Sequence, residues 1–205
     1  PLQTSAHKRG RIYFASEKVF RSDDYGSTWQ VISPDMTRNL DRNRLPLMGR
    51  VWGIDASGKN DGTALYGTVS AFHESPKNEN LLIAGTDDGL VQITTDGGNN
   101  WRKIESFNGA PSMTYVYHVL ASQHNENVMY VTLNNHKRGD FKPYIYKSSN
   151  KGQTWVSISN GLPERGSTYS MAEDFVDANL LFVATEFGVH CSNDGGISWR
   201  QIKGG

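Results

Sequence analysis

The 205-residue sequence has little cysteine, no excess charge of either sign and no long apolar run. Its single cysteine, Cys191, excludes a disulfide within the chain. The 21 Lys and Arg residues balance the 21 Asp and Glu residues, so no overall field attracts nucleic acid or an anionic membrane. A membrane-spanning helix needs about 20 consecutive apolar residues, and no such stretch occurs. We therefore expect no nucleic-acid partner and no membrane span.

What the sequence does contain is a short motif that occurs four times. Its pattern is Ser/Thr-x-Asp/Asn-x-Gly-x-x-Trp, and the copies are Ser22–Trp29, Thr94–Trp101, Ser148–Trp155 and Ser192–Trp199. The chain has 5 Trp, and four of them close a copy. Chance does not place so rare a residue in this way, so the motif marks a true internal repeat.

Each copy has the chemistry of a tight turn between two strands, and we call the four copies the Asp turns. The glycine at the fifth position can adopt φ > 0 without a Cβ clash. The Asp or Asn side chain and the opening hydroxyl can accept hydrogen bonds from backbone N–H groups of the turn. The tryptophan begins the return strand and offers a large apolar surface to bury. We predict structural roles for four residues of each turn. These are Ser22, Asp24, Gly26 and Trp29; Thr94, Asp96, Gly98 and Trp101; Ser148, Asn150, Gly152 and Trp155; and Ser192, Asp194, Gly196 and Trp199.

The spacing of the Asp turns predicts the fold class. The last two copies begin 44 residues apart, at Ser148 and Ser192, and a unit of about 40–50 residues with four short strands is the size of a propeller blade. We therefore predict an all-β chain, a β-propeller segment of four four-stranded blades that belongs to a larger propeller. The expected blades are approximately 1–33, 67–106, 114–159 and 167–203, with an insertion at 34–66. Ser33-Pro34 is typical of a helix start within that insertion.

The repeated turn resembles the Asp box of the bacterial neuraminidase repeat. Several longer stretches resemble large bacterial sortilin-like propeller proteins that are often labelled glycosyl hydrolases. These stretches include Phe20–Ser22, Gly85–Val91, Asp140–Tyr144 and Ala184–Gly188. The resemblance implies a non-catalytic recognition scaffold that is exported to the periplasm, the cell surface or the medium, although no signal peptide opens the sequence.

The sequence lacks the motif of one glycosidase type and offers weak candidates for the site of another. A sialidase would need an Arg-Ile-Pro motif, and here Arg11-Ile12 is followed by Tyr13. A xyloglucanase-type site needs two carboxylates across a cleft. Four acidic residues between the predicted second and third strands are weak candidates, and their alternative role is that of hydrated turn carboxylates. They are Asp87, Asp88, Asp140 and Glu186.

No metal and no cofactor is expected. His73, His118 and His190 belong to different repeat units, and no His, Cys and Asp cluster has metal-ligand spacing.

Two long links are expected on the propeller face away from the Asp turns. Successive connections in an up-and-down blade alternate between the two faces, which places Ser33–Gly67 and Leu133–Lys142 on the same face. Long loops on a rigid scaffold are where binding usually resides. The predicted ligand-binding residues on or beside these links are Arg50, Trp52, His136, Arg138 and Tyr144.

The function predicted from the sequence is recognition of a protein, peptide or glycan, without catalysis. The alternative is a glycoside hydrolase of the xyloglucanase type that uses carboxylates on the face opposite the Asp turns. An open row of blades would leave apolar faces uncovered at both ends. We therefore also expect further propeller blades, from the same or another chain, as partners.

Overall fold

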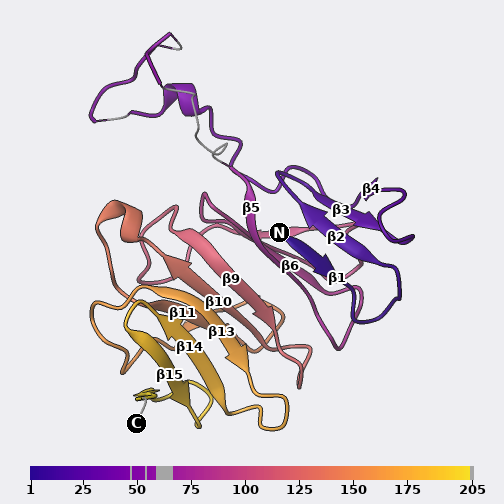
Figure 1. Cartoon of the computed structure of the whole chain (residues 1–205), viewed down its shortest axis with the longest axis vertical. Coiled ribbons are helices and arrows are strands. Elements are labelled where there is room, and N and C mark those ends of the chain that lie inside the picture. Colours follow the sequence, from indigo (N-terminus) through magenta and orange to yellow (C-terminus); the bar gives the residue numbers. More distant parts are fainter. Residues whose placement is uncertain (47, 54, 59–66, 204–205) are drawn as a thin grey trace.

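The computed structural model describes residues 1–46, 48–53, 55–58 and 67–203, and it is built from four four-stranded antiparallel sheets (Figure 1). Each sheet takes four successive strands in chain order. The first two sheets are β1 (Leu2–Thr4), β2 (Ile12–Ala15), β3 (Val19–Ser22) and β4 (Gln30–Val31), then β5 (Val69–Glu74), β6 (Leu82–Thr86), β7 (Val91–Thr94) and β8 (Arg102–Ile104). The last two are β9 (Tyr115–Ala121), β10 (Met129–Asn134), β11 (Tyr144–Ser148) and β12 (Val156–Ser157), then β13 (Thr168–Glu173), β14 (Leu181–Thr185), β15 (Gly188–Ser192) and β16 (Arg200–Gln201). The predicted all-β propeller segment is confirmed.

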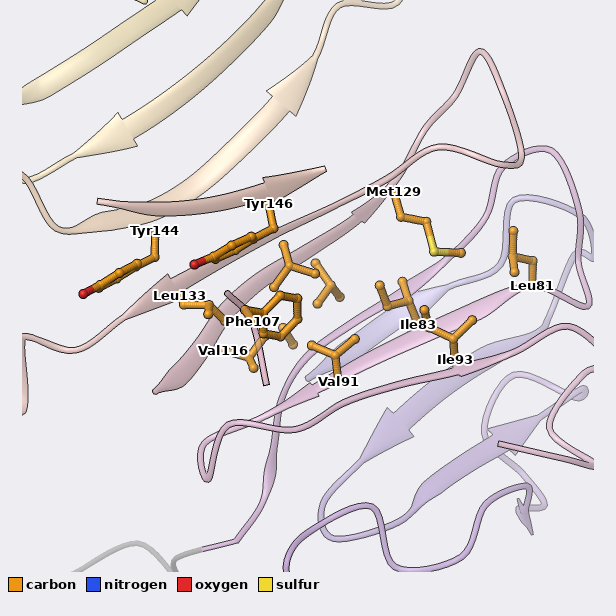
Figure 2. Close-up of a cluster of buried hydrophobic side chains, with 13 residues drawn as sticks. Leu81, Ile83, Val91, Ile93, Phe107, Val116, Met129, Leu133, Tyr144 and Tyr146 are labelled. Carbon is orange, nitrogen blue, oxygen red and sulfur yellow. The ribbon is translucent and has the colours of Figure 1, made fainter. Parts of the chain in front are cut away.

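The sheets pack face to face in a row, and the first and fourth sheets lie at opposite ends of that row (Figure 1). The inner strands β1, β5, β9 and β13 contact one another in order along it. An apolar cluster fills each of the three junctions between neighbouring sheets. Figure 2 shows the second junction, where Ile83 and Val91 of the second sheet meet Met129 and Tyr146 of the third. Burial between sheets therefore supplies the core of the fold.

The up-and-down order of the strands creates two distinct faces. The Asp turns join the third and fourth strands, and they share a face with the links between the first and second strands. We call this the turn face. The links between second and third strands, and between one sheet and the next, lie on the opposite face, which we call the link face. The described part of the insertion and the short 3-10 helix η2 (His136–Arg138) both project from it (Figure 1).

The prediction of a helix that begins at Ser33-Pro34 is wrong. The Ser33 hydroxyl accepts a hydrogen bond from the Val19 N–H at 2.8 Å, which ties this residue to the first sheet rather than to a helix cap. Met36 is fully buried in the first junction. Within the described insertion the single helical element is the 3-10 turn η1 (Arg42–Arg44).

The four Asp turns share one hydrogen-bond pattern. In the first, the Ser22 hydroxyl donates to Asp24 Oδ1 at 2.8 Å and accepts from the Gly26 N–H at 2.8 Å, while the Thr28 N–H donates to Asp24 Oδ1 at 2.8 Å. The same three bonds recur in the other turns. In the third turn Asn150 replaces the carboxylate, and its amide oxygen accepts the same bonds. The pattern therefore needs an acceptor oxygen and does not need a negative charge.

The carboxylates of three Asp turns should make the stability of the fold decrease when the pH falls below about 4. The hydroxyl of Thr28, its N–H and the Ser22 hydroxyl lower the pKa of Asp24 to about 2, and the Thr94 hydroxyl and Asn100 do the same for Asp96. The pKa of Asp194 is also lowered, by the hydroxyls of Ser192 and Ser198. A depressed carboxyl pKa stabilises the fold above the unfolded value near 4, and that stability is lost as the pH falls towards 2.

A triple variant, Asp24→Asn, Asp96→Asn and Asp194→Asn, should therefore keep its fold and lose less stability than the wild type between pH 4 and pH 2. Urea midpoints across this range measure the difference. Glu164→Gln removes an exposed carboxylate outside the turns and serves as the control. Equal acid losses in the triple variant and the wild type would show that the turn carboxylates do not control acid stability.

Candidate functional site

A hollow of about 670 Å³ opens on the link face, between parts of the second, third and fourth sheets. Tyr115 and Tyr117 of β9 and Tyr169 of β13 form its wall, and Asp87, which follows β6, lies at its edge. The η2 segment completes the lining. We call this site the tyrosine hollow.

The three tyrosine rings form a continuous aromatic wall. Tyr115 and Tyr117 lie two positions apart on β9, and the pairing with β10 shifts register at Tyr117, between the His118–Thr132 and Val116–Leu133 pairs. Their ring centroids are 5.7 Å apart, and the Tyr117 and Tyr169 rings stand edge to face with centroids 5.0 Å apart. Tyr117 is 41% exposed, so one large ring is available to a ligand. The wall is built on strands, which hold it more rigidly than a loop would.

Asp87 is held by the backbone that enters the second sheet. Its carboxylate accepts hydrogen bonds from the Thr68 N–H at 2.7 Å and the Gly67 N–H at 3.0 Å. Burial is the largest influence and raises the pKa of Asp87; the negative charge of Asp88 adds to this, and the two N–H donors oppose it. Asp87 is therefore a half-buried acceptor at the edge of the tyrosine hollow.

The η2 segment adds nitrogen-bearing side chains to the lining of the tyrosine hollow. The Lys137 ammonium lies 5.4 Å from the centroid of the Tyr115 ring, and Arg138 donates from Nη1 to the Ser112 carbonyl at 2.9 Å. The Nδ1 atom of His136 is hydrogen-bonded to the side-chain oxygen of Asn134. Two of the predicted ligand-binding residues, His136 and Arg138, thus line the tyrosine hollow.

The other three acidic candidates lie outside the described lining of the tyrosine hollow. Asp88 is fully buried and binds the Thr86 hydroxyl at 2.5 Å and the Arg38 N–H at 2.7 Å, so it anchors the insertion. Burial opposes the change, but hydrogen bonds from Tyr144, Asn135 and Lys142 lower the pKa of Asp140. Glu186 is exposed in the link between β14 and β15.

The remaining ligand-binding candidates take other positions. The guanidinium of Arg50 lies 4.7 Å from the centroid of the Trp52 ring, and both residues belong to the insertion. The Tyr144 side chain is buried, and its hydroxyl donates to Asp140 at 2.7 Å. Tyr144 and Asp140 line a second hollow of about 1000 Å³ at the outer side of the third sheet.

Sequence reasoning missed the tyrosines and Lys137. Tyr115 and Tyr117 lie in the aromatic and apolar run Tyr115–Ala121, and such a run in a sequence indicates ordinary sheet packing. One signal in the sequence could have found them. An aromatic residue, Tyr169, also lies near the start of the inner strand of the fourth sheet, as Tyr115 and Tyr117 do in the third.

Two classes of feature are absent from the described part of the chain. No group of three or more His, Cys, Asp or Glu side chains there could hold a metal ion. None of its helices is long and apolar enough to cross a membrane.

No family model matches the sequence, and no match was found among curated proteins. Solved structures do match it. An ancestral GH74 enzyme aligns with 100% of this chain and 24% of its own length, at 20% identity and a TM-score of 0.67. The GH74 xyloglucanase from Xanthomonas campestris aligns with 98% of this chain and 29% of its own, at 16% identity and a TM-score of 0.66. The Niastella koreensis GH74 enzyme gives the same coverage and identity with a TM-score of 0.64. The chain thus spans about a quarter of the length of these enzymes, and it has the fold of a segment of their propellers.

Proposed function

We propose that the protein is a recognition scaffold that binds a glycan chain in the tyrosine hollow and does not cleave it. The observation that carries this proposal is the wall of three tyrosines on the link face, with a carboxylate at its edge. The resemblance of the Asp turns to the Asp box, and of longer stretches to sortilin-like proteins, supports a binding role. Fold alone does not decide function, so the argument rests on the site.

The chemistry of the tyrosine hollow suits a sugar chain. Aromatic rings present flat apolar surfaces with a polar tip, and these match the C–H faces and hydroxyl groups of a pyranose. Asp87 can accept hydrogen bonds from sugar hydroxyls, and Lys137 can donate them. The Nδ1 atom of His136 donates to the Asn134 side-chain oxygen, which leaves Nε2 as a further acceptor. Ligand sites of this kind combine an aromatic lining with a few placed polar groups. The likeness to GH74 xyloglucanases makes a xyloglucan oligosaccharide the first probe to test.

Hydrolysis would need a second carboxylate. Glycosidases use two, about 5 to 9.5 Å apart on either side of the scissile bond. Among the described residues that line the tyrosine hollow, Asp87 is the single carboxylate.

Removal of the aromatic wall should abolish binding. Tyr117→Ala and Tyr169→Ala should each weaken the affinity for a xyloglucan oligosaccharide by about tenfold or more. Each variant removes an aromatic ring against which a sugar ring would pack. Isothermal titration calorimetry measures the loss. Phe175→Ala, at an exposed aromatic residue on the turn face, is the matched control and should bind as the wild type does. Unchanged affinity in both tyrosine variants would refute the proposed site.

A second candidate function is xyloglucan hydrolysis, for which the support is the likeness in fold to GH74 enzymes. Asp87, whose pKa burial raises, would be its acid, and the second carboxylate would have to come from outside the described lining of the tyrosine hollow. Release of reducing ends from xyloglucan distinguishes the two functions. We expect none from the wild type. Release that Asp87→Asn abolishes would establish the enzyme instead of the scaffold.

A further inference from the structure

The insertion leaves and re-enters the fold at one place, the link between β6 and β7. Near the start of the insertion, the Arg38 N–H donates to Asp88 Oδ2 at 2.7 Å. Just after its end, the Thr68 and Gly67 N–H groups donate to Asp87 Oδ1 at 2.7 Å and 3.0 Å. Two adjacent carboxylates therefore hold the two ends of one loop.

The two ends of the insertion also lie against each other. A Cβ added to Gly67 would lie 3.4 Å from the Thr37 side chain and 3.7 Å from Asp88 Oδ2. Gly67 has a φ of 90°, a left-handed conformation that suits glycine. The entry and the exit of the insertion thus meet beside the β6–β7 link, and a group that fixes one of them also supports the other.

The Arg38 side chain fixes this link from outside the tyrosine hollow. Its Nε donates to the Asp88 carbonyl at 2.9 Å, and its Nη2 donates to the Glu105 carbonyl at 3.0 Å. One planar guanidinium thus ties the β6–β7 link to the segment that follows β8. Arg38 lies outside the described lining of the tyrosine hollow, so its effect on a ligand there is indirect.

The far end of the same link is held without the Arg38 side chain. A Cβ added to Gly89 would lie 2.6 Å from the Met113 Cα atom and 2.9 Å from the Thr114 nitrogen, so these backbones are in close contact. Removal of the guanidinium should therefore loosen the Asp87 end of the link and leave the Gly89 end in place.

Asp87 is the residue through which this end of the link reaches the tyrosine hollow. Its Oδ1 accepts from two N–H groups, whereas its Oδ2 has one longer contact, 3.3 Å from the Gly67 nitrogen. A carboxylate oxygen accepts about two hydrogen bonds, so Oδ1 is saturated and Oδ2 keeps capacity for a ligand hydroxyl. The direction in which Oδ2 is presented depends on the backbone of Gly67 and Thr68, which holds Oδ1.

We infer that Arg38 is a positioning residue of the tyrosine hollow, which acts through the β6–β7 link to keep Asp87 Oδ2 directed at a bound glycan. The choice of glycan rests on the proposed function, whereas the hydrogen bonds that Arg38 supports exist in the free protein. Arg38→Ala removes the guanidinium that joins the carbonyls of Asp88 and Glu105. Arg38→Lys restores the charge but not the fork that reaches both carbonyls.

Amide hydrogen exchange of the free protein, followed by NMR, tests the positioning role without a ligand. Arg38→Ala and Arg38→Lys should each speed the exchange of the Gly67 and Thr68 N–H groups by about tenfold or more. The Gly152 N–H of the third Asp turn is the internal reference and should exchange at the wild-type rate. Arg44→Ala, at a side chain of the same insertion that is 88% exposed, is the matched control and should leave these N–H groups protected.

Calorimetry with a xyloglucan oligosaccharide tests whether Arg38 acts through Asp87. Arg38→Ala should weaken the affinity by about fivefold or more when Asp87 is intact. Asp87→Asn keeps an oxygen for the Gly67 and Thr68 N–H groups and replaces Oδ2 by an amide nitrogen, so it should weaken the affinity as well. In the Asp87→Asn protein, Arg38→Ala should cause little further loss, because the acceptor that Arg38 directs is gone. The double-mutant cycle measures this coupling.

Circular dichroism melts establish that each variant is folded. Unchanged exchange at Gly67 and Thr68 in Arg38→Ala would overturn the inference, and so would exchange that rises equally at Gly152, which indicates a general loss of stability. Equal affinity losses from Arg38→Ala with and without Asp87→Asn would overturn it too. If the wild type binds no xyloglucan oligosaccharide, the proposed ligand is wrong, and the exchange rates still decide the role of Arg38.

Discussion

Replacement of Glu74 by Ala should lower the free energy of unfolding by about 2–4 kcal/mol, one of the largest losses available in this chain. The Glu74 side chain is 2% exposed and lies in the first junction. It accepts from the Ser5 hydroxyl at 2.9 Å, the Ala6 N–H at 2.9 Å and the Tyr13 hydroxyl at 2.7 Å. Truncation leaves the buried Tyr13 hydroxyl without its acceptor, and an unsatisfied buried donor costs about 1–3 kcal/mol. The Ser5 hydroxyl and the Ala6 N–H lie nearer the surface, where water can replace part of the lost contact.

Urea denaturation of three variants tests the role of Glu74. Glu79→Ala is the matched control, because this exposed carboxylate pairs with Arg11 at the surface, where such pairs contribute about 0–1 kcal/mol. The loss of unfolding free energy in Glu173→Ala should lie between the losses in Glu74→Ala and Glu79→Ala. Glu173 is only partly buried, and the Tyr130 hydroxyl is 3.4 Å from it. A Glu74→Ala protein as stable as the Glu79→Ala protein would show that the contact is dispensable.

The second large effect is a loss of stability in mild acid that His73 controls. Burial, and after it the charge of His118, lowers the pKa of His73 to about 4. In the folded state its Nδ1 atom accepts the Ala121 N–H across the second junction at 3.1 Å, which requires the neutral ring. The unfolded chain binds a proton near pH 6.5 and the folded chain does so only near pH 4. Stability therefore falls as the pH decreases between these values, by about 3 kcal/mol in total, and no further through this group below pH 4.

His73→Gln should remove the part of this pH dependence that His73 contributes, because glutamine does not titrate, while His118, whose pKa burial also lowers, keeps its own share. The comparison is the slope of unfolding free energy against pH between 7 and 4. Phe72→Leu, a change at the neighbouring residue on β5, should lower stability without altering the slope. If the wild type and His73→Gln lose stability in parallel, His73 is not the controlling group.

The fold could be predicted because its strongest determinants are local. The pattern that ends at Trp29, Trp101, Trp155 and Trp199 specifies a turn within eight residues, and the strands around it are short β-branched and aromatic runs. The helix expected at Ser33 failed for a tertiary reason, since the Ser33 hydroxyl binds Val19 of the first sheet. Local propensity does not anticipate such a contact.

The site was less accessible to sequence reasoning. His136 and Arg138 were found because they lie on a long link, whereas Tyr117 and Tyr169 lie on strands, and a strand pattern does not distinguish the wall of a hollow from a packed core. Asp88 was indistinguishable from Asp87 in the sequence, because the difference depends on Arg38, fifty residues away in the chain.

A crystal structure of the chain with a xyloglucan oligosaccharide tests the central claim most directly. The account predicts an uncut oligosaccharide in the tyrosine hollow, with sugar rings against Tyr117 and Tyr169 and a hydroxyl group donating to Asp87. A sugar bound on the turn face or beside Tyr144, or a cleaved product in the tyrosine hollow, would contradict it.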